Sequence, residues 1–205
     1  MTMPVLDQVL QLHEAATKGD VAALRRLLAE TDDVDARDEQ GNTALILAAK
    51  AKQREAVSAL LSHGADVNAM SDKGSTAISW AADRGDAGTL KILLEPGGDP
   101  NLRKLGDYYN DMPALHLAAE RDSTDCVQLL LDYGAEIDLR DTQLGRTALL
   151  AALDTDISPN AAALLIRRGA DVNARDKHGF TPLKEAITYD CLEIAELLRQ
   201  AGAME

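Results

Sequence analysis

Aromatic side chains are scarce in this sequence of 205 residues, of which phenylalanine, tryptophan and tyrosine make up only 3%. Because 46% of the residues are nevertheless hydrophobic, the core must be built from leucine, alanine, valine and isoleucine, which suits many short packed helices. Cysteine is nearly absent: Cys126 and Cys191 lie far apart and in no CxxC spacing. Such a pair is no disulfide framework, so we expect a reducing compartment.

Long apolar runs are absent as well. Asp7, His13 and Glu14 interrupt the first twenty residues, and no basic segment precedes an apolar one there. A signal peptide needs both features, and a membrane-spanning helix needs about 20 apolar residues in a row. We therefore expect a cytoplasmic protein that does not bind a membrane.

Positive charge is in short supply. Lysine and arginine number 21 against 34 acidic residues, so the formal net charge is −13. Affinity for nucleic acids comes mostly from lysine and arginine on phosphates, and this balance argues against such ligands. We expect a monomer that binds another protein with a neutral or basic contact surface.

Two sequence motifs recur in step along the chain. The first, of the type Thr-Ala-Leu-x-x-Ala-Ala, occupies residues 43–49, 76–82, 113–119, 147–153 and 181–187, with a degenerate copy at 12–16. The starts of the full copies are 33, 37, 34 and 34 residues apart. The second, of the type Gly-Ala-Asp-Val-Asn, occupies residues 64–68, 97–101, 134–138 and 169–173. Phased motifs at this period indicate stacked structural repeats.

Each repeat predicts two short helices joined by a tight turn. Threonine or proline at the start of the first motif suits a helix N-terminus, and the second helix ends at a glycine. The turn between them needs left-handed backbone, which glycine adopts freely, aspartate tolerates and lysine tolerates less well. The residues at this turn are Gly19, Lys52, Gly85, Asp122, Asp156 and Asp190.

On these two motifs the chain closely resembles the ankyrin-repeat family, over nearly its full length. The resemblance implies an all-α ankyrin-repeat solenoid: stacked helix–turn–helix units, β-hairpin-like fingers, and a concave face made by fingers and inner helices. It also implies structural hydrogen bonds for His13 and His116, which stand at the fourth motif position.

We expect a single domain over residues 1–205, built as a complete module of six repeats. The predicted boundaries are 1–37 for an N-terminal capping repeat, 38–70, 71–103, 104–140 and 141–175 for inner repeats, and 176–205 for a C-terminal capping repeat. Polar residues replace apolar ones at both ends, as caps require: Glu14 in the first repeat, Lys184 and Glu185 in the last.

Catalytic, cofactor and metal-binding signatures are missing. The four histidines form no HExxH motif, and no Cys/His cluster exists. The acidic run at 32–41 resembles a calcium loop, but counted from Asp33 its fifth position is Arg37 and its twelfth is Ala44, so the closing glutamate is lacking. We expect no enzymatic activity, no cofactor and no metal.

The lone tryptophan, Trp80, departs from the repeat pattern. It stands at the motif position that Leu47 and Leu117 hold in neighbouring repeats, which in the family lies towards the concave face. Arg84 and Arg121 follow in the same two repeats. Exposed, Trp80 would form an apolar patch of the kind that marks interaction sites; alternatively, it merely packs between repeats.

The long spacing of 37 residues adds four residues to the finger at 103–112, which holds Asp107, Tyr108 and Tyr109. Insertions in repeat proteins often lie on the binding face, and tyrosine contacts partners well; the alternative is a neutral loop expansion. Residues 104–140 hold eight acidic and three basic residues, which favours a basic partner segment. The predicted partner-binding residues are Leu47, Trp80, Arg84, Asp107, Tyr108, Tyr109, Leu117 and Arg121.

The predicted function is a non-enzymatic protein–protein interaction module, an adaptor or scaffold. The alternative is a stoichiometric inhibitor or immunity-type protein that blocks a basic target enzyme. Fold resemblance does not choose between the two, because function resides in the site and not in the fold.

Overall fold

The computed structural model describes residues 5–31, 33–103, 112–153 and 160–204. By its internal contacts the chain divides into two units, Met1–Lys104 and Leu105–Glu205. The boundary lies within one residue of a predicted repeat boundary. Asp107, Tyr108, Tyr109 and the predicted turn residue Asp156 are outside the described residues.

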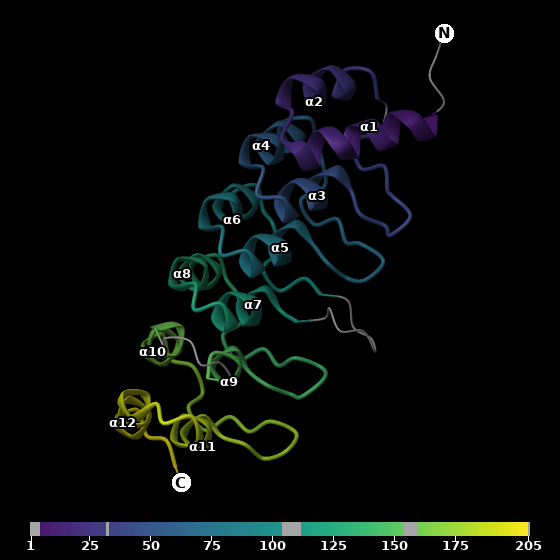
Figure 1. Cartoon of the computed structure of the whole chain (residues 1–205). Coiled ribbons are helices and arrows are strands. Elements are labelled where there is room, and N and C mark those ends of the chain that lie inside the picture. Colours follow the sequence, from purple (N-terminus) through teal and green to yellow (C-terminus); the bar gives the residue numbers. More distant parts are fainter. Residues whose placement is uncertain (1–4, 32, 104–111, 154–159, 205) are drawn as a thin grey trace. The chain divides into compact units, whose positions relative to one another are not determined.

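Within its described residues the first unit contains three helix pairs, which can be followed in Figure 1. Their helices are α1 (Val5–Lys18), α2 (Val21–Leu28), α3 (Ala44–Lys50), α4 (Arg54–Ser62), α5 (Ala77–Asp83) and α6 (Ala87–Leu94). The inner helices α1, α3 and α5 pack in one row and the outer helices α2, α4 and α6 in a second. The segment that precedes α3 and the one that precedes α5 project to one side as fingers.

The second unit repeats this arrangement. Its helices are α7 (Ala114–Glu120), α8 (Thr124–Asp132), α9 (Ala148–Ala151), α10 (Asn160–Arg167), α11 (Pro182–Thr188) and α12 (Leu192–Gln200). Here α7, α9 and α11 form the inner row, and α8, α10 and α12 the outer row. The described part of the chain contains no strand, only one isolated bridge between Met70 and Thr76. The predicted all-α fold is confirmed.

The inner helices begin where the first motif places them. The side chains of Thr43, Thr76 and Thr181 accept a hydrogen bond from the backbone N–H three residues on, which satisfies one of the free donors of a helix N-terminus. Pro182 stands in the first turn, as expected. Pro113, at the first position of its motif, is the N-cap of α7 and has an extended backbone.

The turns between inner and outer helices that the structure describes have the predicted left-handed backbone. Gly19 and Gly85 have φ of 70° and 61°, and Asp122 and Asp190 have φ of 50° and 56°. Lys52 occupies the equivalent turn with φ of 59°. A side chain with a Cβ is disfavoured there by about 1–2 kcal/mol.

Replacing Lys52 by glycine should therefore stabilise the protein by up to about 1 kcal/mol, because relief of the left-handed strain outweighs the greater freedom of glycine in the unfolded chain. Equilibrium unfolding in urea measures the gain as a higher midpoint at unchanged slope. Lys73→Gly serves as a control at an exposed finger position. An unchanged or lower midpoint for Lys52→Gly would contradict the strain.

The second motif builds contacts between neighbouring repeats. In the first unit, Asn68 Oδ1 accepts the Asp99 backbone N–H at 2.8 Å. In the second unit, Asn173 Oδ1 accepts the N–H of Met204 at 2.8 Å and Asp138 that of Asp171 at 2.9 Å. The polar residue that ends this motif thus accepts a backbone hydrogen bond from the equivalent segment of the next repeat and joins neighbouring repeats.

Candidate functional site

The predicted partner-binding residues that the structure describes fall into both units. Leu47 and Trp80 lie half-buried on α3 and α5, and Arg84 is exposed at the C-terminal end of α5. Leu117, half-buried on α7, and Arg121, exposed at its end, belong to the second unit.

Trp80 is held in place by the helix that carries it. A capping box between Thr76 and Ser79 fixes the start of α5: Thr76 Oγ1 accepts the Ser79 N–H at 3.0 Å, and Ser79 Oγ accepts the Thr76 N–H at 2.9 Å. The next two residues after Trp80, Ala81 and Ala82, are fully buried. The indole therefore projects from a rigid helix whose opposite side is anchored in the core.

Two cations lie over the indole ring of Trp80. Lys50 Nζ, from the neighbouring helix α3, is 4.6 Å from the ring centroid, and Arg84 Cζ is 5.4 Å from it. Both distances are within the range of cation–π attraction. We call these three residues, together with Leu47 and Lys52 from the last turn of α3 and the turn after it, the Trp80 cluster. Trp80 is neither a freely exposed apolar patch nor a fully buried packing residue, but a half-buried ring carrying two cations.

The sequence motifs do not single out Lys50. The only sequence signal is its place directly after Ala48 and Ala49, the position at which the next repeat has Asp83. What makes it part of the cluster is the packing of α3 against α5.

The cations of this cluster form few ion pairs within the described residues. In the adjacent repeat, Lys18 pairs with Glu14 at 2.5 Å, and this hydrogen bond raises the pKa of Lys18 above its ordinary value. Within the described residues, Lys50 and Lys52 form no such ion pair. Among the described residues, the ion pair of Arg84 is a long contact with its neighbour Asp83, Nε to Oδ2, at 3.9 Å.

In contrast to the lysines of the Trp80 cluster, a cation on an outer helix of the same unit forms a close ion pair. Arg54 on α4 donates to Asp86 at 2.9 Å, and Asp86 also caps α6 by accepting the N–H and hydroxyl of Thr89. Burial raises the pKa of the Asp86 carboxyl, but the hydrogen bonds from Thr89 and Arg54 outweigh it and leave the pKa below its usual value. This carboxylate therefore links two neighbouring repeats.

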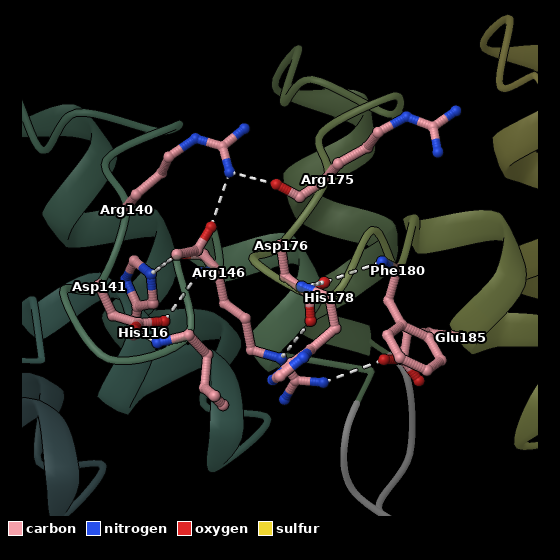
Figure 2. Close-up of polar contacts among 11 residues, drawn as sticks. His116, Arg140, Asp141, Arg146, Arg175, Asp176, His178, Phe180 and Glu185 are labelled. Atoms are coloured by element: carbon pink, nitrogen blue, oxygen red, sulfur yellow. Dashed lines mark hydrogen bonds and ion pairs between the residues drawn. The ribbon is translucent and has the colours of Figure 1, made fainter.

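In the second unit the polar side chains gather between fingers and inner helices (Figure 2). Arg146 is nearly buried, with its guanidinium 3.0 Å from Glu185 and 3.9 Å from Asp176. Asp176 in turn accepts the N–H groups of His178 and Phe180. The three ionised side chains join the finger before α9 to the last repeat.

Glu185 differs from its expected role. As part of a polar cap it should face solvent, but it is only 4% exposed because it turns towards Arg146.

The structural role expected for the motif histidines is borne out. His116 Nε2 lies 2.8 Å from the Arg146 carbonyl oxygen, and His13 Nε2 lies 3.0 Å from that of Ala36.

Metal-ligating side chains do not gather in the part of the chain that the structure describes. No group of three or more histidine, cysteine, aspartate or glutamate side chains there could hold a metal ion. Cys126 is fully buried in α8, as expected for a packed thiol. Within residues 5–31, 33–103, 112–153 and 160–204, no helix has the length and apolar character needed to cross a membrane.

Comparison with known families decides the relationship. A family model described as ankyrin repeats (3 copies) matches residues 12–104, 99–176 and 115–204, which together span most of the sequence. The chain belongs to the ankyrin-repeat family. Ankyrin repeats in general mediate protein–protein interactions, and the fold is typically a non-enzymatic module.

Individual ankyrin-repeat proteins resemble this chain over different shares of its length and of their own. The ankyrin repeat domain of Bcl-3, described as a member of the IkappaB protein family, has a TM-score of 0.83 and 30% identity, with 95% of this chain and 86% of that one covered. An ankyrin repeat domain from Acinetobacter baumannii AYE has a TM-score of 0.84 and 35% identity, with 94% and 98% covered. The chicken nuclear factor NF-kappa-B p105 subunit is 33% identical over 92 residues, or 45% of this chain, but this is only 9% of that relative's length.

Proposed function

We propose that this ankyrin-repeat protein is an adaptor or scaffold that binds a partner protein through its inner-helix surface, with Trp80 at the centre of contact in the first unit. The observation that carries the proposal is the Trp80 cluster. A half-buried indole held on a capped helix, with charged side chains ordered around it, has the composition of a binding hot spot, in which tryptophan and arginine are enriched.

The other predicted contacts extend this proposal. Leu117 and Arg121 occupy in the second unit the positions that Leu47 and Ala51 occupy in the first. Asp107, Tyr108 and Tyr109 lie outside the described residues and remain predicted contacts on the strength of the four-residue insertion alone.

Trp80→Ala should weaken the complex with the partner at least tenfold, which corresponds to about 1.4 kcal/mol, because truncating an aromatic hot-spot residue removes its contact area. Partners captured on the immobilised full chain are identified by mass spectrometry, and their affinities for wild type and variant are then measured by titration calorimetry. Tyr133→Ala is the matched control, since Tyr133 is an exposed aromatic residue (40%) at the end of outer helix α8.

Equal affinity of every partner for wild type and Trp80→Ala, with thermal unfolding unchanged, would refute the proposed binding surface. The same complexes separate the two roles. An adaptor forms a ternary complex in which its partner stays active, whereas the alternative, a stoichiometric inhibitor favoured by the net charge of −13, abolishes the partner's activity at a ratio of one to one.

A further inference from the structure

The charge at the ends of the first unit's inner helices is opposite to that of the whole chain. The segments 14–19, 47–52 and 80–85, which contain the last turns of α1, α3 and α5 and the residues after them, hold four basic residues and two acidic ones. The basic residues are Lys18, Lys50, Lys52 and Arg84. Lys18 is paired with Glu14, so the remaining positive charge is concentrated in the Trp80 cluster.

The described counterparts in the second unit have the reverse sign. Segments 117–122 and 185–190 hold four acidic residues and one basic residue. At the turn position of Lys52 they have Asp122 and Asp190. The positive charge is therefore a property of the first unit and not of the repeat.

Lys52 adds an independent argument. Its left-handed backbone, φ 59°, suits glycine, which occupies the same turn at Gly19 and Gly85 in the repeats on either side. A lysine here is disfavoured because its Cβ crowds the backbone in this conformation, and such unfavourable residues concentrate at functional sites. The side chain contributes what glycine lacks, a cation two residues after Lys50 in the sequence.

Stacking on the indole leaves Lys50 and Arg84 able to bind an anion. A guanidinium or ammonium over an aromatic ring keeps N–H donors for carboxylates. Because the ring already restrains both head groups, less side-chain entropy is lost when a ligand pairs with them. Within the described residues no carboxylate forms an ion pair with Lys50 or Lys52. The 3.9 Å distance between Arg84 Nε and Asp83 Oδ2 is too long for a strong hydrogen bond.

We propose that the Trp80 cluster is a docking site for an acidic, apolar-containing peptide segment of the partner protein. Carboxylates of the segment pair with Lys50, Lys52 and Arg84, and an apolar side chain covers the exposed part of Trp80 and Leu47. A basic segment at this site is disfavoured by like-charge repulsion. The inference rests on the proposed function and specifies the partner chemistry of the same surface; the basic partner expected from the overall charge and from residues 104–140 concerns other parts of the chain.

The test is a selection of random twelve-residue peptides on the full-length protein, followed by titration of the enriched peptides by fluorescence anisotropy. The test variant is Lys50→Gln/Lys52→Gln/Arg84→Gln. The matched control is Arg25→Gln/Arg26→Gln/Lys73→Gln, which removes the same charge from exposed positions on α2 and on a finger. Selected peptides should be rich in aspartate and glutamate. Their affinity should fall at least tenfold in the test variant and less than twofold in the control.

Affinity for these peptides should also fall as salt concentration rises, because exposed charges are screened. Enrichment of neutral or basic peptides, no enrichment, or equal affinity for both triple variants overturns the acidic-segment proposal. So does competition by a single-stranded oligonucleotide, which would reveal a phosphate ligand instead. If captured partners still depend on Trp80 but not on the three cations, the proposed function stands and only the acidic chemistry fails.

Discussion

Arg146→Met should lower the free energy of unfolding by about 3–5 kcal/mol, the usual effect of removing one partner from a buried ionic group. Arg146 is the cation between the carboxylates of Asp176 and Glu185, and these two residues are only 8% and 4% exposed. Methionine keeps the apolar stem of the side chain, so the loss reports the charge and not a cavity. Urea unfolding followed by circular dichroism measures it.

Two further variants assign this loss to the buried charge. Arg146→Met/Glu185→Leu should recover a large part of the stability, because the glutamate no longer lies uncompensated in the interior. Arg168→Met is the matched control, since Arg168 pairs with Asp132 at 2.8 Å on the exposed surface of the same unit; exposed pairs contribute about 0–1 kcal/mol. A loss for Arg146→Met no larger than that of Arg168→Met would contradict the role of the triad.

Gly98→Ala should destabilise the protein by about 1–3 kcal/mol, as overpacking of a core usually does. A Cβ at this buried position would overlap the Leu93 carbonyl oxygen and stand 2.6 Å from Ile78 Cδ1. The backbone oxygen cannot turn aside, so the chain after α6 must shift. Equilibrium unfolding in urea measures the loss.

The repeat pattern alone predicts the opposite outcome for this substitution, because the other copies of the second motif have alanine here, as at Ala65 and Ala135. Those alanines donate a backbone hydrogen bond to Leu60 and Leu130. The control is Ala65→Gly, which should cost about 0.4–1 kcal/mol through the freedom of glycine in the unfolded chain. A stabilising Gly98→Ala would show that the sequence pattern, and not the local backbone, is the better guide.

The architecture was predictable from the sequence because it depends on local and periodic features. The threonine caps of α3 and α5, the left-handed turns at Gly19 and Gly85, and the small buried pair Ala81–Ala82 each follow from residue type and position. Repetition then multiplies a weak local signal over neighbouring units that can only bury their apolar faces by stacking.

The candidate site was predictable only in part. Trp80 and Arg84 stand out as single residues, but Lys50 joins them only through the packing of α3 on α5, 30 residues earlier in sequence than Trp80. The environment of Glu185 was likewise not predictable from its place in the sequence. Its polarity indicates a cap, whereas its burial depends on Arg146, 39 residues away.

By itself the sequence determined the ankyrin-repeat fold, the helix boundaries near the motifs and the absence of recognised catalytic motifs. Only the tertiary structure decided which charges of different repeats meet: Arg146 is compensated by Asp176 and Glu185, whereas Lys50 lies over the indole of Trp80 and has no ion pair within the described residues. Residue type and period specify the backbone, but electrostatic energy depends on distances between side chains from different repeats. The single tryptophan of this aromatic-poor, acidic sequence thus lies, in the folded first unit, beneath two cations from two different repeats.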